Sequence, residues 1–124
     1  MTNPYLFRSS LICGVFVISA AFLIDTDKLL CSNAIHGVAS SLANHYWTND
    51  FYKKYDRLAM VIGFLINAYF IIKNKSFDCA FLILLAASLY FVAKKVKSDK
   101  LHAGAHVAIS ACMILLFLKS SSAN

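Results

Sequence analysis

Charge and helix-breaking residues are scarce in this sequence. Only 15% of the 124 residues are charged, all six acidic residues are aspartates, and glutamate is absent. A soluble domain of ordinary composition has about 25% charged residues, so this composition argues against that class. Proline occurs once, at Pro4, ahead of every predicted helix, so no helix is expected to be broken in its middle. The four cysteines form no CxxC pair, and we expect buried, reduced thiols.

Long apolar blocks separated by short charged clusters make up the rest of the sequence. Hydrophobic residues account for 60% of the chain. This pattern predicts an all-α integral membrane bundle with a single transmembrane domain over residues 1–124. The five expected transmembrane helices cover about 9–24, 29–47, 57–72, 77–93 and 101–118.

Two of these helices differ in polarity from the others. The segment 29–47 carries several serines, asparagines and histidines, which makes it too polar to face lipid on all sides. We therefore expect it to be the interior helix of the bundle. The segment 77–93 is the most uniformly apolar and is expected at the periphery, facing lipid.

The lysines and arginines predict the orientation in the membrane. The N-terminus and the second and fourth loops hold eight of them, and the other loops and the tail hold the remaining four. The positive-inside rule then places the N-terminus inside, in a membrane that the sequence does not specify. The chain has a net charge of +6, but its basic residues lie between the apolar blocks and not on one amphipathic face. No nucleic-acid partner is therefore expected.

The polar residues of the predicted spans form two pairs. Ser41 and His45 are four residues apart, as are His102 and His106, so each pair shares one helical face. The end of helix 29–47 and the starts of helices 57–72 and 101–118 lie at the same membrane face, which brings Asp56 to the same place. Three neutral imidazoles leave one position of a tetrahedral zinc open, as in catalytic sites. Asp56 would then orient or deprotonate a water at that site.

Simpler explanations exist for each residue taken alone. A single histidine near a helix end often hydrogen-bonds to headgroups, backbone or water, and a serine often bonds back to its own helix. His36 lies nine residues before His45 and faces the other way, so it is left out of the metal site. Asn67 lies nearly on the face of Asp56 about three turns deeper, and a helix–helix hydrogen bond is the simpler explanation for it.

The order and spacing of these residues resemble a known group of membrane proteins. The sequence reads SLANH at Ser41–His45, YDRLAMVI at Tyr55–Ile62 and LHAGAH at Leu101–His106. This SxxxH, Asp, HxxxH pattern is similar to that of the superfamily of alkaline ceramidases, progestin and adipoQ receptors, hemolysin III proteins and Per1-like factors, with spacing most like the ceramidase branch. The resemblance implies zinc held by His45, His102 and His106, catalytic roles for Asp56 and Ser41, and hydrolysis of a lipid amide.

The sequence also departs from that pattern. Members of the superfamily usually have seven helices, whereas five are predicted here. The two missing helices would lie between the aspartate and the HxxxH helix. Because their number is even, the HxxxH helix keeps its orientation in the membrane. The acidic segment that binds calcium in alkaline ceramidases has no counterpart before the first predicted helix. The resemblance therefore does not extend to ceramide as the substrate.

Three functions are compatible with this sequence. The leading hypothesis is a zinc-dependent membrane hydrolase that cleaves an amide bond, or else an ester bond, in a lipid arriving laterally from the bilayer. The second is a non-enzymatic subunit of a larger membrane complex that retains the fold, in which case the partners are other subunits or further copies of the chain. The third is a haem-binding protein with two histidines as axial ligands. An open lipid-sized cavity would distinguish the enzyme from the subunit.

Overall fold

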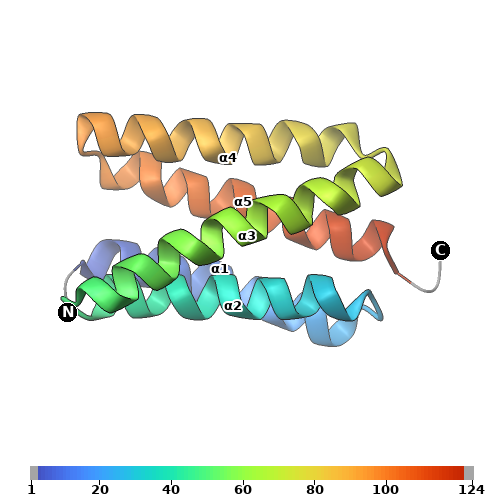
Figure 1. Cartoon of the computed structure of the whole chain (residues 1–124), viewed down its shortest axis with the longest axis horizontal. Helices are drawn as coiled ribbons and strands as arrows, with labels where there is room; N and C mark the ends of the chain where they lie inside the picture. Colours follow the sequence, from blue (N-terminus) through green and yellow to red (C-terminus); the bar gives the residue numbers. More distant parts are fainter. Residues whose placement is uncertain (1–2, 122–124) are drawn as a thin grey trace.

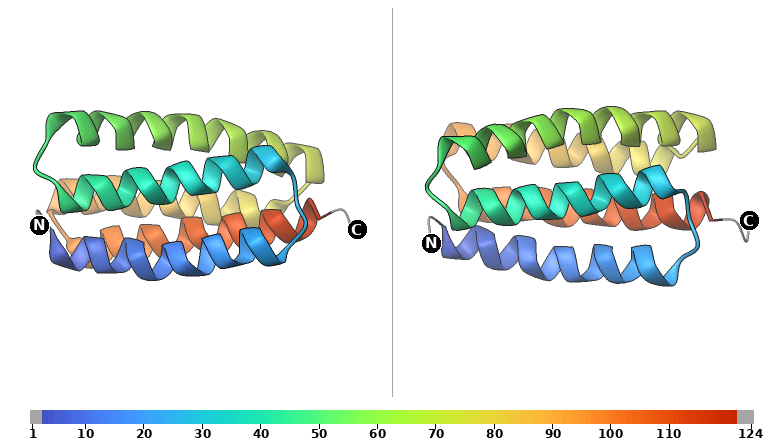
Figure 2. Two further views of the ribbon diagram at one scale, coloured as in Figure 1. Left: turned by 90° about the horizontal axis from the view of Figure 1, so that it is seen from below. Right: turned by 60° about the horizontal axis from the view of Figure 1, so that its bottom comes forward.

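The computed structural model describes residues 3–121 of the chain. These residues form five α-helices and no strand, so the predicted all-α fold class is confirmed (Figure 1). The helices are α1 (Pro4–Leu23), α2 (Lys28–Tyr46), α3 (Asp50–Asn74), α4 (Phe77–Val96) and α5 (Asp99–Lys119). Short links make each helix antiparallel to the next. We call the end of the bundle where α1, α3 and α5 begin the histidine end, and the opposite end the distal end (Figure 2).

Two helices begin more than two residues before their predicted starts, and a capping asparagine explains each. Asn3 caps α1 by accepting a hydrogen bond from the Leu6 amide, with Pro4 as the first helical residue, so the placement of Pro4 outside the helices was wrong. Asn49 likewise caps α3, which begins at Asp50 and not near residue 57. As a result Asp56 lies about two turns inside α3 and not at its start.

The outer surface of the bundle is apolar. Four helices, α1, α3, α4 and α5, are long and apolar enough to cross a membrane, which indicates a multi-pass membrane protein. Large side chains point outward along the bundle, and four of them are more than three quarters exposed: Phe22, Leu23, Ile72 and Phe77. The polar helix α2 is not among the four. It lies antiparallel between α1 and α3 and extends over the same depth (Figure 2).

The interior helix is α5. It packs against each of the other four helices, whereas α2 packs only on α1, α3 and α5. The prediction that helix 29–47 is the interior helix was therefore wrong. Its polar residues face α1 and α3, and its opposite face, with His36, is exposed. The apolar α4 packs chiefly on α5 and lies at the edge of the bundle, as expected for a peripheral helix (Figure 1).

The two halves of the bundle are packed differently. The dry core fills the distal half, where side chains such as Val17, Leu30, Leu116 and Phe117 are almost completely buried. Toward the histidine end α3 and α4 separate, because α3 packs chiefly on α2 while α4 follows α5 (Figure 1). Asp56, His102 and His106 line the space that this separation leaves.

Candidate functional site

Three histidines converge at the histidine end of the bundle. His45 is the second-last residue of α2, and His102 and His106 occupy the first two turns of α5. One ring nitrogen from each lies within 4.8 Å of the corresponding nitrogens of the other two. The ring centroids are 4.8 Å apart for His102–His106, 5.2 Å for His45–His102 and 5.5 Å for His45–His106. The predicted meeting of the three imidazoles is thus present in the structure.

Contacts from α1 hold the two helix ends together. The backbone N–H of Asn3 donates to the carbonyl oxygen of His45 at 3.0 Å. The side-chain Nδ2 of Asn3 donates to the carboxylate of Asp99 at 3.3 Å. One residue therefore connects the end of α2 to the start of α5. Further along α1, Gly14 permits close approach, because a Cβ there would lie 2.6 Å from Val38. These contacts fix where α1 lies beside the histidines.

The histidine cluster has the chemistry of a metal site. His45 is only 5% exposed, and its Nε2 atom has no hydrogen-bond partner within residues 3–121. A buried, unpaired ring nitrogen is costly unless something binds it. Tetrahedral zinc with Zn–N bonds of about 2.05 Å needs nitrogens about 3.3 Å apart. The ring nitrogens now lie within 4.8 Å of one another, so they would have to move closer by up to about 1.5 Å to bind one zinc ion. The three imidazoles are the donor type and number that such a site requires.

Two serines of α1 orient His106. The Ser9 hydroxyl lies 3.0 Å from His106 Nδ1, and the Ser10 hydroxyl lies 3.5 Å from the same atom. When Nδ1 carries the proton and donates it to Ser9, the lone pair of Nε2 is available to a metal. Ser10 also bonds to the Ser41 hydroxyl at 2.7 Å. The predicted site residue Ser41 is therefore connected to His106 through Ser10.

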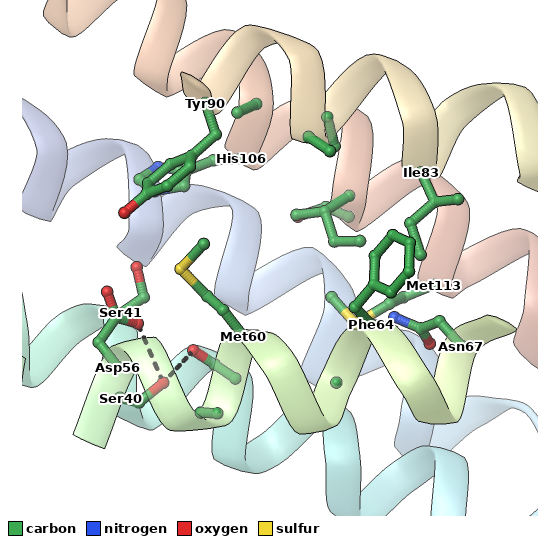
Figure 3. Close-up of a pocket in the computed structure, with 18 of the residues that line it drawn as sticks. Ser40, Ser41, Asp56, Met60, Phe64, Asn67, Ile83, Tyr90, His106 and Met113 are labelled. Atoms are coloured by element: carbon green, nitrogen blue, oxygen red, sulfur yellow. Dashed lines mark hydrogen bonds between the residues drawn. The ribbon is translucent and has the colours of Figure 1, made fainter. Parts of the chain in front are cut away.

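Asp56 lines the same cavity as His102 and His106 and has its own hydrogen-bond partners. Its carboxylate accepts hydrogen bonds from Ser40 at 3.2 Å (Figure 3) and from Asn44 at 2.9 Å. Asp56 does not belong to the cluster of three histidines that could share a metal ion. Ser40 and Asn44 are four residues apart on α2, next to the face that carries Ser41 and His45. Thus α2 directs one pair of side chains to Asp56 and the adjacent pair to α1 and α5.

A cavity of about 530 Å³ opens beside these residues. This volume is within the usual range for small-molecule sites. Its walls come from all five helices and include Ser41, Asp56, Tyr90, His102, His106 and Met113 (Figure 3). Gly37 also lines it, and a Cβ added there would meet no atom within 4 Å. The space beside α2 is therefore open and is not filled by side chains.

Sequence reasoning missed several residues of this site. Ser40 and Asn44 were noted only as polar residues of helix 29–47, although their spacing of four indicates a shared face. Tyr90 was read as part of an apolar helix, yet its ring packs edge-on against His102 at 5.3 Å, and its hydroxyl points into the cavity (Figure 3). A lone tyrosine gives no periodic signal, so only the fold reveals it.

Two residues that were kept out of the metal site lie apart from it. His36 is exposed, on the face of α2 away from the cluster. Its Nδ1 atom lies 3.2 Å from the Tyr55 hydroxyl oxygen. Asn67 bonds to Asn33 across α2 and α3, as the helix–helix interpretation predicted.

Comparisons of the chain with protein-family models, curated proteins and solved structures found no match. The function must therefore be argued from the site itself.

Proposed function

We propose that this protein is a zinc-dependent membrane hydrolase that cleaves an amide bond, or else an ester bond, in a lipid, in the manner of the alkaline ceramidases that its motifs resemble. The proposal rests on the cluster of His45, His102 and His106, of which His102 and His106 line a lipid-sized cavity. Neither feature alone would suffice. A three-histidine cluster without a cavity would suit a structural metal, and a cavity without the cluster would suit a simple lipid-binding protein.

The chain's own residues have distinct roles in this proposal. His45, His102 and His106 would hold the zinc ion, which would supply a Lewis acid to the reaction. Asp56, held by Ser40 and Asn44, would accept a proton from water and pass it to the leaving nitrogen. The Ser10 and Ser41 hydroxyls share a hydrogen bond in which either can donate. With Ser10 as the donor, Ser41 would donate its own proton to the carbonyl oxygen as negative charge develops there.

The open cavity favours an enzyme over the alternatives. A subunit that kept the fold only for assembly would not need an unfilled space of about 530 Å³ next to its histidines. The histidine geometry favours a single ion over haem. Haem needs two imidazoles that face each other across the thickness of a porphyrin, whereas here three rings gather around one point.

The separation of α3 and α4 supports lateral access for the substrate. The cavity reaches the outer surface between these helices, where its rim includes the exposed apolar residues Val61, Leu65, Leu84 and Phe91. Surfaces of this kind face lipid chains in a membrane. A lipid could therefore reach the histidines without leaving the bilayer.

Charge distribution supports an orientation with the N-terminus inside. Eight of the twelve lysines and arginines lie at the histidine end of the bundle, either in the links there or in the helical turns next to them. Reporter fusions to the two ends of the chain should place the N-terminus inside and the C-terminus outside, because α1 begins and α5 finishes at opposite ends of the bundle (Figure 1). Reporters in the same compartment would contradict the five-span arrangement.

The metal proposal predicts loss of zinc from three variants. Purified protein should hold about one zinc per chain by elemental mass spectrometry, because three imidazoles complete the protein's share of one site. His45→Ala, His102→Ala and His106→Ala should each lose the metal on dialysis against a weak chelator. His36→Ala is the matched control and should keep it, because His36 faces away from the cluster. Equal zinc in all four variants would contradict ligation by these histidines.

The catalytic proposal predicts that Asp56→Asn loses activity but not metal. The asparagine can still accept from Asn44 and donate to Ser40, so the helix contact should survive. Hydrolysis of a fluorescent N-acyl lipid in mixed micelles should fall at least about a hundredfold, the usual scale of general acid–base catalysis. Asp50→Asn, at the exposed start of the same helix, is the control and should remain active. Loss of zinc or of folding in Asp56→Asn would instead make Asp56 a ligand or a structural group.

A further inference from the structure

The deep end of the cavity carries a polar side chain that the proposed chemistry does not use. Two rows of residues run down facing helices from the histidine end, Asp56, Met60 and Asn67 on α3, and His102 and Met113 on α5. Asp56 and Asn67 are eleven residues apart, which is about 16 Å along the helix and nearly on the same face. Asn67 thus faces the same cavity far from the reacting groups (Figure 3).

The amide of Asn67 is only half satisfied by the protein. The residue is 3% exposed, and its Oδ1 accepts a hydrogen bond of 3.4 Å from Asn33. Its Nδ2 group has no hydrogen-bond partner within residues 3–121, and it points from α3 toward the cavity (Figure 3). Two unused N–H donors therefore lie at the deep end of the cavity.

No side chain of the described residues accepts a hydrogen bond from these donors. Apolar side chains of the cavity wall, Phe64, Ile83 and Met113, lie around Asn67 (Figure 3), and the wall also includes Ser110. Within a membrane an unpaired amide is costly because no water replaces the missing acceptor. A contact that only joined α2 to α3 would not require a donor aimed away from α2. The arrangement is better explained by an acceptor on the molecule that fills the cavity.

We propose that Asn67 recognises an oxygen atom carried partway along the lipid chain, such as a hydroxyl, ketone or epoxide oxygen. This inference rests on the proposed function, because it assumes that the scissile carbonyl lies at the histidines. The chain would extend from there toward the distal end, with its oxygen about 16 Å away at Asn67. The preferred substrates are then lipids with an oxygenated acyl chain, in place of plain saturated ones.

Equilibrium binding tests this preference without turnover. The probes are two N-acyl lipids with the same head group, one with a plain stearoyl chain and one hydroxylated near its twelfth carbon. Their competition with a fluorescent fatty amide is measured on the full chain carrying Asp56→Asn. The hydroxylated lipid should bind about five- to tenfold more tightly, the usual gain from one buried hydrogen bond. Equal affinity of the two lipids, or no binding of either, would overturn the inference.

Two substitutions separate recognition from helix packing. Asn67→Leu should abolish the preference while the plain lipid still binds, since leucine has a similar shape and no donor. Asn33→Leu removes the bond between α2 and α3 but leaves the Asn67 donors in the cavity, so the preference should persist. If both variants lose thermal stability and neither changes the affinity ratio, Asn67 only joins the helices. A retained preference in a protein that hydrolyses no lipid would refute the proposed reaction and leave this inference standing.

Discussion

A polar group inside an apolar bundle must find its partner within the bundle, and this constraint explains most of the histidine end. Asp56 is acceptable there because Ser40 and Asn44 donate to it. His106 has the Ser9 hydroxyl beside one ring nitrogen. The Nε2 atom of His45 has no hydrogen-bond partner within residues 3–121, and it lies where three imidazoles meet. A metal ion would satisfy it, so the same rule that explains the paired groups also points to the proposed zinc.

The division of the bundle into a packed half and an open half gives the site its surroundings. The distal core of α5 and its neighbours fixes the helices relative to one another, with Cys79 and Cys112 each donating to the other's carbonyl oxygen. Because the distal half is packed, the histidine half can remain open without loss of the fold. The departure of α3 from α4 then connects the cavity to lipid, which a soluble enzyme of this size could not allow.

Sequence periodicity predicted the helices well because long apolar blocks leave few alternatives. It also predicted that His45, His102 and His106 would meet, since the parity of the helices alone determines which ends share a face. It could not predict the interior helix, because polarity marks where a helix needs partners and not how many neighbours it has. The early start of α3 was missed because aromatic and basic residues after Asn49 resemble a loop until the cap is recognised. The aspartate's contact with Ser40, adjacent to the motif serine, depends on helix rotation that spacing does not determine.

The proposed zinc ion would be held by ring nitrogens of His45, His102 and His106. X-ray absorption at the zinc edge of the purified, detergent-solubilised chain tests this proposal most directly. The account predicts a four-coordinate site with imidazole scattering from three rings and Zn–N distances of about 2.0 to 2.1 Å. Sulfur scattering from cysteine, a six-coordinate shell of oxygens, or a zinc content well below one per chain would contradict it.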